Sequence, residues 1–354
     1  MKSGGSSLAL TAALASAVLF GATTPIAKEL LSGASPLMVA GLLYVGSGVG
    51  VSLVWLAQYR GKSPIALLRS DWAWLAAATV AGGMVAPVLL MTGLRQLDAA
   101  TASLLLNLET VFTALLAWIG FREATNARVI TGLLAIVAGG ALLAWRSHGS
   151  APASIFGSSL VAAACLAWAL DNNLTRKVSG ADARVIAAVK GLAAGCASTT
   201  LALALGDPLP APPHVAAILL LGFVGYGLSL VLFVIALRHL GSARTGAYFA
   251  TSPFVGTAVA IGLFGQPVTA LFWVAAALMA VGVWLHLSER HDHDHLHEPL
   301  THSHMHVHDA HHRHSHEASW GGDEPHAHEH HHEPLLHRHP HFPDIHHRHG
   351  HRRG

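Results

Sequence analysis

The segment Gly93-Leu94-Arg95-Gln96-Leu97 recurs 143 residues later as Ala236-Leu237-Arg238-His239-Leu240. The same shift continues without gaps through the two apolar stretches that follow, so Ser252 of the second copy aligns with Glu109 of the first. Earlier in each half, Ser32-Gly33-Ala34 corresponds to Ser179-Gly180-Ala181. Weak internal symmetry of this kind indicates that the chain contains two copies of one structural unit.

Apolar residues dominate the part of the chain that carries the repeat. The 354 residues are 52% hydrophobic and 11% charged, whereas soluble proteins carry about 25% charged residues. A membrane-spanning helix needs about 20 mostly apolar residues. We therefore expect an all-α membrane protein with ten transmembrane helices, at 8–31, 36–58, 72–94, 99–120, 127–145, 154–175, 183–205, 214–237, 243–264 and 268–287.

Five helices then fall in each repeat, the first within residues 1–147 and the second within 152–288. An odd number of crossings inverts the second repeat across the bilayer, an architecture of many secondary transporters. Lys and Arg favour cytoplasmic loops. With a cytoplasmic N-terminus, twelve of the basic residues near helix ends lie inside and three outside. We expect a multi-pass protein of a bacterial inner membrane with both termini in the cytoplasm.

Residues 289–354 form a His-rich tail of a different composition. This segment holds 24 of the 28 histidines, together with 11 acidic and 6 basic residues. Polar segments with so few apolar residues cannot form a core. We expect the tail to be disordered and cytoplasmic.

The tail contains its own repeat, because Glu298–His316 corresponds to Glu333–His351 at a shift of 35, with twelve identical positions. His-x-His alternation puts imidazoles on one side of an extended chain, and imidazoles with carboxylates suit Zn²⁺, Ni²⁺, Co²⁺ or Cu²⁺. A solvated, pH-sensitive brush and an affinity tag are the alternatives. The predicted metal ligands are His302, His304, His306, Asp309, His311, His312, His337, His339, His341, Asp344, His346 and His347.

The stretch Leu106-Asn107-Leu108-Glu109-Thr110-Val111-Phe112-Thr113-Ala114-Leu115-Leu116-Ala117-Trp118 is followed by Phe121-Arg122-Glu123 and by an apolar run from Gly132 to Gly140. This pattern resembles the EamA-type fold of the drug/metabolite transporter superfamily, and the resemblance covers residues 8–287. It implies the export of small solutes such as amino acids, metabolites or drugs. The second repeat departs from the family pattern in carrying Gln266 where a loop glutamate is usual.

Glu109 lies near the middle of the fourth apolar segment. An ionised carboxylate at a helix centre costs about 2.5–3.5 kcal/mol on insertion scales, so it should face the bundle interior. There it can bind a proton or a cation alternately, as a coupled exporter requires. Thr113 shares its face and is placed to hydrogen-bond it. The alternative is a static polar contact with the ninth helix.

Asp171 and Lys190 are expected at similar depth in the sixth and seventh helices, where a salt bridge would neutralise both charges. In the alternative, Asp171 and Asn172 line a hydrophilic entrance to a central cavity, as the resemblance implies. Trp168 shares the face of Asp171 and is either a cavity wall or core. Tyr248 and Ser252 are the ninth-helix counterparts of the Glu109 region.

The sequence therefore predicts a secondary transporter, an exporter of small metabolites or drugs with a metal-binding tail. The alternatives are an exporter of divalent metal (Ni, Co or Zn) that uses the tail as collector, and a membrane-anchored metal sensor without transport. Phosphate loops, nucleophilic triads and dinucleotide fingerprints are absent from the sequence, so we expect no enzyme activity, no required cofactor and no nucleic-acid partner. The expected partners are membrane lipid, a small-molecule or ion substrate and divalent metal at the tail. Small residues such as Gly139 and Gly140 also leave a homodimer open.

Overall fold

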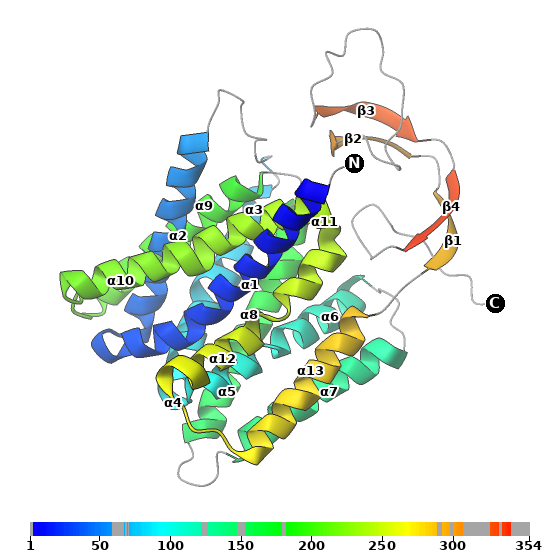
Figure 1. The fold of residues 1–354 in the computed structure, drawn as a ribbon. Coiled ribbons are helices and arrows are strands. Elements are labelled where there is room, and N and C mark those ends of the chain that lie inside the picture. The colour runs from blue at the N-terminus through cyan, green and yellow to red at the C-terminus, as the bar shows by residue number, and fades with distance from the viewer. Residues whose placement is uncertain are drawn as a thin grey trace. The chain divides into compact units, whose positions relative to one another are not determined.

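The computed structural model describes residues 3–58, 67, 69, 71–121, 127–146, 153–178 and 182–288, and four tail strands. The chain divides into two compact units, Met1–Glu289 and Arg290–Gly354. The first unit is a helical bundle (Figure 1). Its elements are α1 (Ser3–Leu30), η1 (Leu31–Gly33), α2 (Pro36–Gln58), α3 (Asp71–Ala78), η2 (Thr79–Val85), α4 (Ala86–Gln96), α5 (Ala99–Leu105), α6 (Leu108–Phe121), α7 (Ala127–Arg146), α8 (Ala153–Thr175), η4 (Arg176–Val178), α9 (Ala183–Ala204), α10 (Pro212–Gly222), η5 (Phe223–Leu228), α11 (Ser229–Phe249), α12 (Ser252–Phe264) and α13 (Ala270–Leu287).

Eight helical segments within the described residues are long and apolar enough to cross a membrane. They agree with the first eight segments expected from the sequence, with shifts of a few residues. The last two expected spans correspond to shorter apolar helices, Ser252–Phe264 and Ala270–His286. The protein is thus an all-α membrane protein in which eight of the ten expected spans are confirmed by length and composition.

Each repeat contains an interrupted helix at nearly the same place. In the first repeat α5 ends at Leu105 and α6 begins at Leu108, and in the second α11 ends at Phe249 and α12 begins at Ser252. These breaks agree with the repeat shift to within one residue. The prediction of one continuous ninth helix over 243–264 was wrong. Pro253 lies in the first turn of α12, and a proline cannot supply the N–H that would continue α11.

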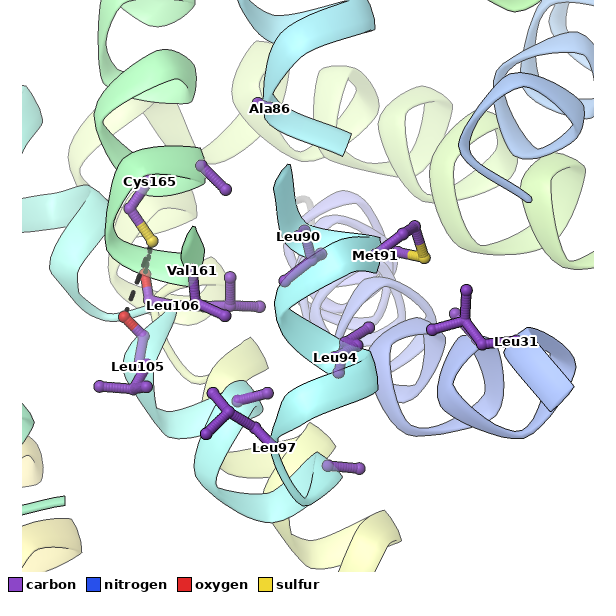
Figure 2. Close-up of a cluster of buried hydrophobic side chains, with 14 of the residues drawn as sticks. Leu31, Ala86, Leu90, Met91, Leu94, Leu97, Leu105, Leu106, Val161 and Cys165 are labelled. Carbon is purple, nitrogen blue, oxygen red and sulfur yellow. Dashed lines mark hydrogen bonds between the residues drawn. The ribbon is translucent and has the colours of Figure 1, made fainter. Parts of the chain in front are cut away.

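The first interruption is held by local hydrogen bonds. The N–H groups of Leu106 and Asn107 bond to carbonyls three residues back, at 3.2 and 3.1 Å, which is the tighter 3₁₀ pattern. Asn107 Nδ2 donates to Leu104 O at 2.9 Å. Cys165 Sγ lies 3.7 Å from Leu105 O and 3.9 Å from Leu106 O, as Figure 2 shows. Side chains therefore satisfy carbonyls that the broken helix leaves without their usual partners.

Two π-helical segments also occupy equivalent places in the repeats. The segment η2 lies between α3 and α4, and η5 lies between α10 and α11, 144 residues later. A π-helical turn inserts an extra residue and is frequent at functional sites. The local irregularities of the backbone therefore repeat together with the sequence.

Helix contacts follow the same two-fold scheme. The second helices of the two repeats, α2 and α9, pack together, and so do the fifth helices, α7 and α13 (Figure 1). In one half α1 packs against α11 and α12, and in the other half α8 packs against α4 and α6. Exchanging the repeats therefore maps the α1 pairs onto the α8 pairs and maps α2–α9 and α7–α13 onto themselves.

The described residues of the tail form two antiparallel ladders. Strand β1 (Asp292–His297) pairs with β4 (Leu335–Pro340), and β2 (Leu300–His306) pairs with β3 (His326–His332). Alternating His-x-His sequences favour an extended chain, and strand pairing satisfies its backbone groups without needing a core.

Glycines allow α2 and α9 to approach closely. A Cβ atom on Gly191 would lie 2.7 Å from the Cα atom of Gly48. Contacts between small residues are a main source of helix association in membranes.

We expect Gly191→Val to push α2 and α9 apart and to lower the free energy of unfolding by about 1–3 kcal/mol, as over-packing does. Gly262→Val is the matched control, because that helical glycine has open space where a Cβ would lie. Thermal unfolding of both purified variants in detergent measures the difference. Equal stability of the two variants would contradict the close α2–α9 contact.

Candidate functional site

Glu109 lies in the first turn of α6, directly after the interruption that separates α6 from α5. Asn172 Nδ2 on α8 donates a hydrogen bond of 2.8 Å to Glu109 Oε1. The N-terminus of a helix favours negative charge because its first N–H groups point toward it. No cationic side chain forms an ion pair with Glu109 among the residues that the structure describes.

Asp171, the residue before Asn172, forms an ion pair with Lys190 on α9. Thr175 Oγ1 donates a hydrogen bond of 2.8 Å to Asp171 Oδ1, and Lys190 Nζ lies 3.3 Å from Thr175 Oγ1. The side chains of Lys190 and Asp171 keep 15% and 11% of their surface exposed. The predicted salt bridge is therefore confirmed, and it neutralises both charges inside the bundle.

Trp168 is buried one turn before Asn172 on α8. Its Nε1 donates to Gly82 O at 3.0 Å, and Tyr44 Oη donates to the same carbonyl at 2.7 Å. Gly82 belongs to the π-helical segment η2. A Cβ atom there would overlap the carboxylate of Asp171, so only glycine fits. The carbonyl of Gly82 is therefore a shared acceptor for Trp168 and Tyr44.

A row of aromatic rings leads away from Tyr44. Its ring centroid lies 5.6 Å from that of Tyr226 on η5, and Tyr226 lies 5.6 Å from Phe20 on α1. Phe20 in turn lies 5.2 Å from Phe249. Glu109 is close enough to interact electrostatically with both tyrosines. The site thus combines one carboxylate without a cation and several aromatic rings.

The structure brings most of the predicted residues together and separates others. Asn172 bonds to Glu109, Asp171 pairs with Lys190, and Trp168, on the same helix as Asp171 and Asn172, bonds to Gly82. The expected Glu109–Thr113 hydrogen bond was wrong, because Thr113 Oγ1 is buried without a partner among the described residues.

Tyr248 and Ser252 are not members of this group. The helix interruption puts Tyr248 at the end of α11, where it packs against an alanine cluster that includes Ala12 and Ala236. Ser252 is buried at the start of α12, and a Cβ atom on Gly21 of α1 would overlap its carbonyl. The interruption separates Tyr248 in α11 from Ser252 in α12, and their role as ninth-helix counterparts of the Glu109 region stays a prediction.

Tyr44, Tyr226, Gly82 and Thr175 were missed by the sequence reasoning. A signal for the tyrosines existed, because each lies inside an apolar stretch, where a phenol hydroxyl needs a partner. Thr175 lies four residues after Asp171 on α8, a spacing that already places the two side chains on one face. For Gly82 the sequence carries no comparable signal, because its contact is with a helix distant in the chain.

Metal coordination has no support in the bundle. No group of three or more His, Cys, Asp or Glu side chains is arranged to hold a metal ion within the part of the chain that the structure describes. Of the predicted tail ligands, His302, His304 and His306 lie in β2, and His337 and His339 in β4. The others lie outside the described residues: Asp309, His311, His312, His341, Asp344, His346 and His347.

Comparison with protein-family models shows two matches to the EamA-like transporter family, over residues 7–145 and 155–288. The two matches contain the two sequence repeats. A solved crystal structure shares the fold with a TM-score of 0.59 at 19% identity, covering 80% of this chain and 96% of the other.

Curated relatives agree with this family. An "Uncharacterized transporter" of Methanothermobacter thermautotrophicus is 27% identical over 286 residues, which are 76% of this chain and 82% of the relative. The "Uncharacterized inner membrane transporter YedA" of Escherichia coli K12 is 21% identical over 277 residues, 75% of this chain and 86% of the relative. The "Probable 4-amino-4-deoxy-L-arabinose-phosphoundecaprenol flippase subunit ArnE" of Pseudomonas paraeruginosa is 34% identical over 110 residues, 30% of this chain and 93% of the relative.

The Asp171–Lys190 pair gives a test of the site's electrostatics. We expect Lys190→Met to lower the free energy of unfolding by about 3–5 kcal/mol, because it leaves a buried carboxylate unpaired. The double variant Lys190→Met with Asp171→Asn should recover most of this loss. Thermal unfolding of the two single variants and the double variant measures the coupling. Additive losses would mean that the two side chains do not act as a pair.

Proposed function

The chain belongs to the EamA-like transporter family, and from that premise we propose that it exports a small solute by alternating access. The family consists of transporters, so membrane transport and not enzyme catalysis is the activity of this multi-pass membrane protein. We propose that it lies in a bacterial inner membrane with both termini in the cytoplasm. Its partners are then membrane lipid and the transported solute.

This mechanism requires that the two repeats have inverted orientations in the bilayer. Five apolar segments in each repeat require opposite orientations in the bilayer. The exchange of helix pairs between repeats, such as α1–α11 with α8–α4, supports this arrangement. Two inverted halves can rock about a site between them and open it to one side at a time.

Hydrogen bonds between the repeats at the expected outer end support a state that is closed there. His214 Nε2 at the start of α10 lies 2.7 Å from Leu30 O at the end of α1. Gln266 Oε1, between α12 and α13, accepts from Ala100 N on α5 at 3.0 Å. Ser35 and Asp207 are also hydrogen-bonded. Opening toward the outside would break these contacts.

Glu109 is the residue that carries the proposal. It follows an interrupted helix, and interrupted helices form the substrate and ion sites of many secondary transporters. Ionisable residues within membrane segments are usually functional. We assign Glu109 as the coupling or substrate carboxylate, positioned by Asn172.

We expect Glu109→Gln to reduce solute flux at least about tenfold, because the amide cannot carry the charge that binds or couples the solute. Proteoliposomes loaded with a panel of amino acids, organic cations and divalent metals measure this flux. Glu29→Gln, at an exposed position of α1, is the matched control. Unchanged flux in Glu109→Gln would assign Glu109 to structure alone.

Metal capture by the tail is a second proposed function. In the β2–β3 ladder, His302 is opposite His330 and His304 is opposite His328. This register supports binding of Zn²⁺, Ni²⁺, Co²⁺ or Cu²⁺ by cross-strand histidines. The tail would then collect metal for export or sense it.

Deleting residues 291–354 should abolish most binding of Ni²⁺ and leave the bundle folded, because the bundle is a separate compact unit. Equilibrium dialysis measures bound Ni²⁺, and gel filtration in detergent checks the fold. Equal Ni²⁺ binding by the truncated chain would contradict metal capture by the tail. Failure of the truncated chain to insert would contradict the independence of the bundle. Flux of Zn²⁺ and Ni²⁺ in proteoliposomes distinguishes a metal exporter from an exporter of other solutes.

A further inference from the structure

Three helices meet where α1 crosses α12. Helix α1 packs against α12, and α5 packs against both (Figure 1). A Cβ atom on Gly256 of α12 would lie 2.7 Å from Gly21 O on α1 and 2.8 Å from Ser103 Oγ on α5. Helices α1 and α5 belong to the first repeat and α12 to the second. The Gly21 carbonyl and the Ser103 hydroxyl therefore lie next to each other at a junction between the repeats.

These two polar groups lack their usual partners. Ser103 is 1% exposed, and its Oγ has no hydrogen-bond partner among the described residues. Pro25 lies inside α1, and a proline has no N–H to donate to the carbonyl four residues earlier, which is that of Gly21. Buried polar groups in folded proteins nearly always find a partner. A donor and an acceptor without their usual partners thus lie side by side.

A trapped water does not fit at this point. A water that replaces missing partners needs free volume as well as two to four polar groups. The space beside Gly256 does not admit even a methyl group unless its neighbours shift, because both oxygens already contact the glycine. A small movement of the helices, which would let Ser103 donate to Gly21 O, satisfies both groups without a water.

The ends of the same three helices carry contacts at the expected outer end. Leu30 O, at the end of α1, lies 2.7 Å from His214 Nε2. Ala100 N, at the start of α5, donates to Gln266 Oε1, which follows α12. If these contacts break when the outer end opens, α1, α5 and α12 are free to move relative to one another. The junction at Gly256 lies within the helices that this opening would shift.

The second repeat cannot form an equivalent bond. Helix α8, which corresponds to α1, contains no proline, and the shift of 143 puts Gly246 where the first repeat has Ser103. In two identical inverted repeats, the states open to either side would have equal free energies, because exchanging the repeats converts one state into the other. A bond that only one repeat can form therefore favours one state.

We propose that Ser103 donates a hydrogen bond to Gly21 O when the outer end is open, and that this bond sets the balance between the two access states. In the described state, with its outer contacts formed, the bond is absent. The inference rests on the proposed function, because it requires that the protein alternates between two states.

Spin labels at the outer end measure the balance. Ser32→Cys on the first repeat and Leu209→Cys on the second are both exposed positions. The background carries His214→Ala, which removes one outer contact so that both states are populated, and Cys196→Ser, which removes the exposed native cysteine. Double electron–electron resonance of the full chain in lipid nanodiscs should give two distances, the longer one from the open state.

We expect Ser103→Ala to lower the ratio of open to closed protein about threefold to tenfold, the factor that one hydrogen bond supplies. Pro25→Ala gives Gly21 O a donor within α1 and should lower the ratio by a similar factor. The double variant should lower it no further, because both changes remove the same bond. Ser158→Ala is the matched control, since Ser158 on α8 is another buried hydroxyl without a partner among the described residues, and it should keep the ratio.

The outcomes separate this inference from the proposed function. Two distances with an unchanged ratio in Ser103→Ala would overturn the inference and leave alternating access in place. Additive effects of Ser103→Ala and Pro25→Ala would also overturn it, because Gly21 O would then not be the partner of Ser103. A single distance in every variant would overturn both the inference and the opening of the outer end. Gel filtration checks the fold, and if Ser103→Ala does not fold, an unchanged ratio in Pro25→Ala alone overturns the inference.

Discussion

Lipid hydrocarbon offers no hydrogen bonds, so every backbone N–H and C=O within the bilayer must find a partner inside the protein. Unbroken helices meet this condition by themselves. The interruptions at 106–107 and 250–251 and the π-helical segments η2 and η5 do not. Side chains take over the freed carbonyls: Cys165 and Asn107 at the first interruption, and Tyr44 and Trp168 at Gly82. The irregular backbone therefore draws polar and aromatic side chains to one part of the bundle.

Two carboxylates close to each other in this region have different surroundings. Asp171 forms an ion pair with Lys190 and accepts a hydrogen bond from Thr175, and the Asp171–Lys190 pair carries no net charge. Glu109 has the amide of Asn172 as its hydrogen-bond donor. A buried ion pair mainly fixes the arrangement of its helices, whereas a carboxylate with a neutral partner can exchange one cation for another. The two carboxylates therefore differ in the charge of their partner, which is cationic for Asp171 and neutral for Glu109.

Backbone N–H and C=O groups find their hydrogen-bond partners in different ways in the bundle and in the tail. The bundle buries apolar helices against each other, with glycines such as Gly48 and Gly191 where helices approach most closely. The tail has few apolar residues and pairs short strands instead, so that histidines lie opposite histidines at several positions of the ladder. Extended pairing needs no core, which is why a polar sequence can adopt it in two-stranded form.

The amino-acid sequence by itself indicated the helical membrane class, the duplication and eight of the spans, and it offered the Asp171–Lys190 pair as one of two alternatives. The length of an apolar span and the cost of a charge in lipid depend on local sequence, so both can be judged without the tertiary structure. The sequence also singled out Glu109. Its partner Asn172 was predicted only to line a hydrophilic entrance, and not to bond to Glu109. The tertiary structure alone decided that α11 continues to Phe249, that Thr113 does not bond to Glu109, and that Tyr44 and Tyr226 join the site. A helix that is apolar on all sides has no periodic pattern that indicates which face contacts which neighbour. Those contacts can therefore be assigned only from the packed structure.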